Sequence, residues 1–312
     1  MPDATESAPA LLAIDAGQTG IKTRLVTPDA APREALFPGV LTDRPLLPQL
    51  SSVVAAVSRD AGAVPRTVTF GVSGLTDAGA EASALLSDPA LAQVQRVVVT
   101  HDSVTSFLGV LGDQYGSVIA AGTGVVTLGV GPEHSARVDG WGYLMGDTGS
   151  GFWIGRAALE AVMRAFDGRG PATALTAVVQ ERWPDLASAY SALQASEDRV
   201  RTVASFAAPT AALAEAGDGV AIEICRAAAA ELALAAVTSL RVTDAPADAA
   251  VGAVGGVFGS ALVRSAFEDA VRASRPDARF VPRQGSGLDG AVALAGLGAQ
   301  HPLRERFADL VR

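Results

Sequence analysis

The stretch ALLAIDAGQTGIKTRLVT, residues 10–27, contains two short strand patterns on either side of a glycine-rich turn. The first pattern is an apolar run that ends at Asp15 and Gly17. The second, over 20–27, alternates apolar and polar side chains, as a half-exposed strand does. We therefore expect a hairpin whose turn presents backbone N–H groups, and such a turn suits the binding of an anion, phosphate above all.

The same pattern of two strands around a tight glycine turn occurs again at residues 117–131, in SVIAAGTG followed by VVTLGVG. Each half then has the order strand, strand, strand, helix, strand, helix, strand, helix. In the first half, the later strands are expected at 34–37, 67–74 and 96–102, and the helices at 44–60, 77–86 and 103–113. In the second half, the later strands are expected at 247–256 and 278–282, and the helices at 219–243, 259–273 and 288–298. The pattern predicts an α/β fold of two tandem domains, 1–115 and 116–312, with a ligand cleft between them.

The composition favours a packed soluble protein and argues against several classes. Apolar residues make up 49% of the chain, and the formal net charge of −9 argues against a nucleic-acid or anionic-membrane surface. Cys225 is the only cysteine, so neither an intrachain disulfide nor a multi-cysteine metal site can form. The N-terminal MPDATESAPA lacks the basic and apolar regions of a secretion signal, and we expect a cytoplasmic protein.

Nucleotide and hydrolase motifs of other folds do not fit this chain. GQTGIKT (17–23) is not a P-loop, because Ile21 takes the place of the glycine before the lysine. GSGLDG (285–290) matches GxGxxG, but only 22 residues follow it, and we interpret it as a loop and helix start. The chain has three histidines and no GxSxG motif. His101 precedes Asp102, but neighbours on a strand point to opposite faces, so we expect them not to share a site.

Asp102 and the stretch GWGYLMGDTGSGFWIG (140–155) are candidates for chemistry outside the glycine turns. Asp102 follows a strand pattern and precedes a helix, so it is either a helix N-cap or a carboxylate that lines the cleft. The stretch at 140–155 combines six glycines, two tryptophans and one acid, Asp147. Glycine lets backbone approach a ligand, tryptophan offers a flat face to a sugar ring, and a carboxylate accepts hydrogen bonds from hydroxyls. A glycine-rich hinge with core tryptophans is the alternative.

These segments, in this order, resemble the N-acetylglucosamine kinase group of the BadF/BadG-type ATPase family, within the actin–hexokinase–Hsp70 superfamily. IDAGQTGIKTRL is similar to the family's first phosphate motif, AGTGVVTLG to its second, and VVVTHDSVTSFLG to the segment with its catalytic base. GWGYLMGDTGSGFWIGRAAL is close to its most specific motif, GWG…GDEGSGYWIG, while VGAVGGVFGS and DGAVALAG resemble its adenosine segment and closing helix. The resemblance implies two ribonuclease-H-like domains of the actin/hexokinase type, the second with a helical insertion.

The resemblance also implies a role for each matched position. Asp102 would be the catalytic base, and Trp141, Gly142 and Asp147 would bind the sugar. Asp15 would hold Mg²⁺, through water, and Thr19 would bond the phosphates of ATP. The full set expected to bind the nucleotide is Asp15, Gly17, Gln18, Thr19, Gly122, Thr123, Gly124, Gly255 and Gly256.

Several positions depart from the family pattern. Ala16 and Gln18 replace glycines of the first phosphate motif, and Val125 replaces the serine of the second. His101 replaces an asparagine before the catalytic base, and Thr148 replaces a glutamate beside Asp147. The last change leaves the exact sugar open. Thr42 and Asp43, on a loop that enters a helix, are candidates for recognising an acetamide group.

The sequence therefore predicts an ATP-dependent kinase that converts N-acetylglucosamine to N-acetylglucosamine 6-phosphate, with Mg²⁺ as cofactor. Glucosamine or glucose is the alternative substrate. Two further alternatives are an iron–sulfur ATPase activator, which a single cysteine argues against, and a sugar-sensing repressor, which needs a DNA-binding segment before the first strand. The expected partners are a small sugar and neither nucleic acid nor membrane, and a homodimer is one assembly that these expectations allow.

Overall fold

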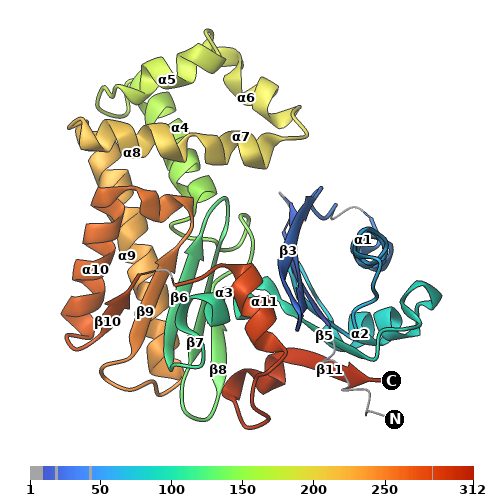
Figure 1. The fold of residues 1–312 in the computed structure, drawn as a ribbon. Coiled ribbons are helices and arrows are strands. Elements are labelled where there is room, and N and C mark those ends of the chain that lie inside the picture. Colours follow the sequence, from blue (N-terminus) through green and yellow to red (C-terminus); the bar gives the residue numbers. More distant parts are fainter. Residues whose placement is uncertain (1–9, 18–19, 42–43, 283) are drawn as a thin grey trace, which may run out of the picture. The chain divides into compact units, whose positions relative to one another are not determined.

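The computed structural model describes residues 10–17, 20–41, 44–282 and 284–312 (Figure 1). The chain divides into two compact units. Unit 1 comprises Met1–Gln114 and Arg283–Arg312, and unit 2 comprises Tyr115–Pro282. In chain order, unit 2 is therefore inserted between two parts of unit 1.

Unit 1 is built on a six-stranded mixed sheet in the order β11-β5-β4-β1-β2-β3. β1 and β2 form the expected antiparallel hairpin, in which Asp15 lies opposite Lys22, while β1, β4 and β5 run parallel. Parallel neighbours bring their carboxyl ends to one edge of the sheet, where α/β proteins place their ligands. The strands are β1 (Leu11–Ala16), β2 (Ile21–Thr27), β3 (Ala30–Phe37), β4 (Thr67–Val72), β5 (Arg96–His101) and β11 (Phe307–Val311).

Alternate residues of β1 face two different helical layers. Leu12 and Ile14 belong to the core that includes Leu50 of α1 and Leu85 of α2. Ala13, between them, packs instead on Leu288 and Ala291 of α11. α11 also packs closely on α3, because a Cβ on Gly290 would collide with the carbonyl oxygen of Thr105. The helices are α1 (Leu46–Ala61), α2 (Ala78–Ser87), α3 (Asp102–Leu111) and α11 (Gly287–Leu294).

Unit 2 has a five-stranded sheet in the order β10-β9-β6-β7-β8 and a set of helices on it. The long helix α9 lies so close to β7 that a Cβ on Gly129 would stand 2.7 Å from the carbonyl oxygen of Ser239. The strands are β6 (Gly116–Ala121), β7 (Val125–Val130), β8 (Ser135–Val138), β9 (Ala250–Val254) and β10 (Arg279–Val281). The helices are α4 (Gly151–Phe166), α5 (Leu175–Arg182), α6 (Leu186–Gln194), α7 (Arg199–Ser205), α8 (Ala207–Glu215), α9 (Gly219–Val242) and α10 (Ala261–Ser274) (Figure 1).

The expected elements form, and the structure adds one strand that the sequence did not indicate. β11 pairs antiparallel with β5, its Phe307 opposite Thr100, so it extends the sheet of unit 1. The segment from Arg283 onward accordingly packs in unit 1, whereas we had expected all of 116–312 to form one domain. α11 begins where GSGLDG predicts a helix start. Within the part of the chain that the structure describes, none of the helices combines the length and apolar character needed to cross a membrane.

Candidate functional site

Unit 2 contains a pocket of about 550 Å³ that joins two of the motifs singled out in the sequence. Gly122 and Thr123, from the second glycine turn, line one part of it, and Gly256 from the expected adenosine segment lines another. The volume lies in the range of small-molecule and cofactor sites. The structure therefore brings these two distant stretches to one cavity of a size that suits a nucleotide.

The second glycine turn is held by the start of α4. The Gly151 N–H donates to the carbonyl oxygen of Gly122 at 2.7 Å, and the Phe152 N–H donates to that of Thr123 at 3.0 Å. A Cβ on Gly151 would lie 2.9 Å from the same Gly122 oxygen, so only glycine allows this approach. With these two carbonyls occupied by α4, the turn has a fixed shape at the edge of the pocket.

The adenosine segment also depends on a glycine. Gly255 follows β9 with a φ of 101°, in the region that disfavours side chains, and a Cβ there would collide with the carbonyl group of Ala121. Nothing lies within 4 Å of the Cβ position of Gly256, the next residue. Gly255 thus lets β9 turn beside β6, while Gly256 leaves open space toward the pocket.

The remaining wall of the pocket is largely apolar and comes from the helical layer. α7 and α8 contribute small side chains, and α9 contributes Cys225, which burial holds protonated by raising the pKa of its thiol to about 11. Arg201 and Glu215 are the charged residues that line the pocket. Small apolar side chains beside a few polar groups are typical of a wall on which a nucleobase packs. The alanines that line the pocket are Ala204, Ala207, Ala208, Ala211 and Ala212.

Asp139, which the sequence analysis did not single out, organises the glycine-rich loop before α4. Its carboxylate accepts the N–H groups of Gly140, Asp147 and Thr148 at 2.7, 2.8 and 2.9 Å and the Thr148 hydroxyl at 3.0 Å. Burial would raise the pKa of Asp139, but these hydrogen bonds outweigh it and hold the pKa below its usual value. An aspartate directly before a Gly-x-Gly turn is the signal that could have identified it.

Asp147 is buried within the same loop, and only 9% of the residue is exposed. Its Oδ1 accepts the Gly142 N–H at 3.1 Å, and the Val125 N–H also donates to this carboxylate. Burial raises the pKa of Asp147, and the nearby Asp139 carboxylate adds to the rise. A carboxylate held in this way costs stability when ionised, which is typical of a group kept for function.

The tryptophans of the loop have different environments. Trp141 is 58% exposed and its ring lies under the Arg137 guanidinium, 4.7 Å from ring centroid to Cζ. Trp153, on α4, packs on the core of unit 2. Of the two, only Trp141 therefore has an exposed aromatic ring of the kind that we expected for a sugar, and Trp153 has the core role that was the alternative.

In unit 1, Asp15 near the end of β1 lies directly under the start of α11. A Cβ on Gly287, the first residue of α11, would lie 2.9 Å from both carboxylate oxygens of Asp15. Glycine at this position lets the Asp15 carboxylate lie against the first residue of the helix. The start of α11 is therefore packed directly beside Asp15.

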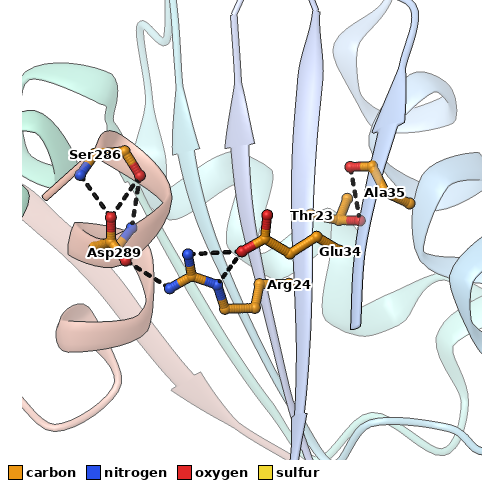
Figure 2. Close-up of polar contacts among 6 residues, drawn as sticks. All are labelled: Thr23, Arg24, Glu34, Ala35, Ser286 and Asp289. Atoms are coloured by element: carbon orange, nitrogen blue, oxygen red, sulfur yellow. Dashed lines mark hydrogen bonds and ion pairs between the residues drawn. The ribbon is translucent and has the colours of Figure 1, made fainter. Parts of the chain in front are cut away.

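A polar network holds α11 in this place (Figure 2). Arg24 of β2 donates from Nη1 to Asp289 Oδ1 at 2.6 Å and from Nε to Glu34 Oε1 at 2.8 Å. Asp289 also forms a capping box with Ser286 at the start of α11. The Ser286 hydroxyl, the Ser286 N–H and Arg24 together lower the pKa of Asp289 to about 2, against an opposing effect of burial. The network ties the N-terminus of α11 to the hairpin that carries Asp15.

Asp102 is the first residue of α3, and His101 is the N-cap. His101 Nδ1 lies 2.9 Å from Asp102 Oδ1, so the expectation that these two side chains do not share a site was wrong. The alternation of side chains holds within a strand, but the chain changes from β5 to α3 between these two residues. The Asp102 side chain is 29% exposed, which leaves it open to a ligand.

Four expected site residues, Gln18, Thr19, Thr42 and Asp43, lie outside the described residues. The described carboxylate expected to hold Mg²⁺ is Asp15, and the described residues contain no cluster of three or more metal-ligating side chains. One carboxylate suits this ion, because Mg²⁺ in phosphoryl-transfer sites is held by one or two carboxylates together with substrate phosphates and water. The residues present therefore fit an ion that arrives with the nucleotide.

Comparison with protein families gives a match over residues 12–295 to the BadF/BadG/BcrA/BcrD ATPase family. The chain belongs to this family. The matched residues include most of both units.

Two curated relatives match short segments. An N-acetylmuramic acid/N-acetylglucosamine kinase of Clostridium acetobutylicum is 36% identical over 86 residues, which is 27% of this chain and 28% of the relative. An N-acetyl-D-glucosamine kinase of Dictyostelium discoideum is 47% identical over 75 residues, 24% of each chain. The chain thus spans about a quarter of the length of the curated relatives that it matches.

Among solved structures, a proposed N-acetylglucosamine kinase from Chromobacterium violaceum has a similar fold, with a TM-score of 0.72 and 24% sequence identity. The similarity covers 92% of this chain and 98% of that one. The fold is therefore α/β with two mixed sheets, as the sequence predicted.

Proposed function

We propose that this protein is a sugar kinase that transfers the γ-phosphoryl group of ATP to the 6-hydroxyl of N-acetylglucosamine. The observation that carries the proposal is the pocket of unit 2, which joins the second glycine turn to the glycine pair after β9 in a chain of this ATPase family. The names of the two curated relatives support the choice of sugar.

The proposed nucleotide site uses the pocket along its length. The adenosine packs on the open backbone at Gly256 and on the alanine wall, and the phosphates follow the turn formed by Gly122, Thr123 and Gly124. For Gly17, Gln18 and Thr19, the expectation from the sequence that they also bind the phosphates stays a prediction. Backbone N–H groups that are fixed before the ligand arrives stabilise phosphate charge without a cost of reorganisation.

Asp15 is the proposed ligand of Mg²⁺, through water. When bound, this ion neutralises charge that develops on the transferred phosphoryl group. The task of the protein is to keep the carboxylate in place, and the close packing of Gly287 on Asp15 supports that role.

Asp102 is the proposed general base. It accepts the proton of the 6-hydroxyl as the hydroxyl oxygen bonds to the γ-phosphorus, and ADP leaves with the electron pair of the broken bond. The partial exposure of its side chain, at the start of α3, supports this assignment.

Asp147, Gly142 and Trp141 are the proposed sugar contacts. Asp147 has hydrogen bonds from two backbone N–H groups, and its carboxylate has further lone pairs that can accept from sugar hydroxyls. Trp141 supplies an exposed ring face. Thr42 and Asp43 stay candidates for the acetamide, and glucosamine or glucose stays the alternative substrate.

The test is a coupled assay of ADP release with purified protein, ATP and Mg²⁺. The panel holds N-acetylglucosamine, N-acetylmuramic acid, glucosamine and glucose, with a no-sugar control for ATP hydrolysis. We expect the highest kcat/KM with N-acetylglucosamine. Sugar-independent hydrolysis alone would favour the ATPase-activator alternative, although Cys225, which is buried, is the only cysteine available for a cluster. Cytoplasmic location and a homodimer stay predictions.

A further inference from the structure

Helix α8 turns one face toward the pocket of unit 2. The residues of α8 that line the pocket recur about four positions apart, which is the spacing of one helix face. They are Ala207, Ala208, Ala211, Ala212 and Glu215. Four of them are alanines, and the fifth places a carboxylate on the wall at the last residue of the helix.

The two ends of the pocket differ in their distance from the glycine turn. At one end, the carbonyl oxygen of Ala204 lies 3.7 Å from the Cβ position of Gly151, whose N–H donates to Gly122 of the turn at 2.7 Å. From there the chain passes from α7 into α8. The nine residues of α8 extend about 12 Å further, at about 1.5 Å per residue, to Glu215. Glu215 therefore lies at the end of the pocket that is far from the turn.

The charges on the wall give a nucleotide one orientation in the pocket. Arg201 lies one helical turn before Ala204, at the end with the glycine turn, where a positive charge suits phosphates. At the other end, the Glu215 carboxylate repels phosphate and can only accept hydrogen bonds. Burial, and after it the charge of Glu215, raises the pKa of the Cys225 thiol, which lines the same pocket. The negative charge of Glu215 therefore acts at the pocket wall.

The stability of the fold does not account for an acid at this position. Glu215 is exposed and is the last residue of α8, where the negative end of the helix dipole disfavours a carboxylate. Among the residues that the structure describes, no basic side chain forms a salt bridge with Glu215. Its oxygens are therefore available to accept from a ligand in the pocket.

We propose that Glu215 selects the base of the nucleotide by accepting a hydrogen bond from the exocyclic amino group of adenine. This inference rests on the proposed nucleotide site and deepens it. With the phosphates at the glycine turn and the ribose along the alanines, the base lies at the far end, beside the carboxylate. A purine that lacks the amino group covers the carboxylate without giving it a donor, so it binds less tightly.

The test is isothermal calorimetry of the full chain with Mg²⁺ and without sugar. The ligands are ATP, 2′-deoxy-ATP and purine riboside triphosphate, which has a hydrogen in place of the amino group. We expect the wild type to bind ATP about tenfold or more tightly than purine riboside triphosphate, and E215A to bind the two within about twofold. E215Q keeps a neutral acceptor and should retain part of the preference.

Two results would overturn the proposal. One is a ratio of the ATP and purine riboside affinities that E215A leaves unchanged. The other is an effect of E215A only on the preference for ATP over 2′-deoxy-ATP, which would place Glu215 beside the ribose.

The matched control is E223A. Glu223 is an exposed glutamate of α9 that is not among the residues lining the pocket. E223A changes the net charge as E215A does, so it should keep the affinity ratio of the wild type. Thermal unfolding of E215A should match that of the wild type, because the carboxylate is exposed at a helix end that disfavours it. A lower unfolding temperature with an unchanged affinity ratio would make Glu215 a structural residue.

Calorimetry without sugar separates this inference from the proposed activity. If the protein binds ATP with the expected preference and phosphorylates no sugar in the panel, only the proposed activity fails. If it phosphorylates the sugar and binds ATP and purine riboside triphosphate equally, only the role of Glu215 fails. If it binds none of the triphosphates, the pocket is not a nucleotide site and the role of Glu215 is overturned with it.

Discussion

Asp102 is the residue on which the proposed chemistry depends most directly. D102N keeps the shape and size of the side chain and removes the base, so we expect kcat to fall by about a hundredfold or more. Sugar affinity, measured by isothermal calorimetry, should change little, since the amide can still hydrogen-bond the hydroxyl. A kcat close to that of the wild type would show that Asp102 is not the general base.

At Asp147, a substitution should affect sugar binding much more than the stability of the fold. Burial and the nearby Asp139 carboxylate raise the pKa of Asp147, so the fold disfavours its ionised form and D147N should cost little stability at neutral pH. The same change should weaken sugar binding roughly tenfold or more, because a charged acceptor is lost.

The matched control is D139N in the same loop. Asp139 has a lowered pKa and accepts four hydrogen bonds, so this change should lower the free energy of unfolding as well as activity. Denaturant unfolding of both variants, with calorimetry for the sugar, makes the comparison. An equal loss of stability in D147N would make Asp147 a structural residue.

Thr123 tests the assignment of the second glycine turn to the nucleotide. T123V removes the hydroxyl and preserves the branched shape, and its backbone carbonyl still accepts the Phe152 N–H. We expect the KM for ATP to rise severalfold, the size of effect of one lost hydrogen bond, with little change in the KM for the sugar. An effect confined to the sugar would assign the turn to the wrong ligand.

At the scale of elements, the start of α11 contains Asp289, which makes the stability of the fold depend on pH, and it lies beside the proposed Mg²⁺ ligand Asp15. Asp289 has a pKa of about 2 in the folded protein, below the 3.8 of an unperturbed aspartate, so it stabilises the fold at pH values above about 4. That contribution should be lost as the pH falls from about 4 to about 2, when the carboxylate is protonated.

Urea unfolding at pH 7, 4 and 2 should therefore show a steeper loss of stability for the wild type than for D289N. D60N is the control, since Asp60 pairs with Arg33 on the surface with a side chain that is 80% exposed. At neutral pH, D289N should also raise the KM for ATP, because α11 no longer fixes Asp15. Parallel pH curves for wild type and D289N would contradict the role of the network.

Elements with a local signal could be predicted from the sequence, and those defined by distant pairing could not. Both hairpins have apolar runs on either side of a glycine turn, and the buried face of α9 follows its spacing of apolar residues. β11 has only five residues, and its partner β5 lies about two hundred positions earlier, so no local pattern indicates it. The hydrogen bonds to Asp139 depend on a loop in which Asp139, Gly140 and Asp147 have positive φ, and composition does not reveal these backbone conformations.

In the candidate site too, features with a local sequence pattern could be predicted and features that depend on the three-dimensional structure could not. The glycine turns and the glycines after β9 could be placed by motif, because each is a short local pattern, and at Gly255 the backbone requires glycine. The contact between His101 and Asp102 could not, because it depends on the residue at which β5 gives way to α3. Element boundaries are the least certain part of a sequence-based prediction, and here one boundary decides a contact.

At the scale of the whole molecule, the two units should respond separately to loss of β11. Deletion of 307–312 removes the partner of β5 and the pair of hydrogen bonds, at 2.8 Å each, from Arg96 to Asp309. The deletion also removes the side chain of Phe307, a residue that is 9% exposed. Burial of a side chain of this size stabilises the fold by roughly 1.5–3 kcal/mol.

Amide hydrogen exchange of the deletion variant should show which strands lose protection. We expect faster exchange in β4 and β5 of unit 1 and unchanged exchange in β6 and β7 of unit 2. F307L, which keeps the strand and most of the apolar contact, is the control. Equal loss of protection in both units would show that they unfold as one.

The insertion of unit 2 between two parts of unit 1 has a consequence for biosynthesis. Tyr115–Pro282 emerges from the ribosome before α11 and β11 do, so the second unit can begin to fold while the first still lacks a helix and an edge strand. During that interval, the nascent chain exposes the edge of β5, a template for pairing with other chains. A chaperone that shields this edge until translation ends would therefore raise the yield of native protein, and slowing translation after residue 282 should lower it.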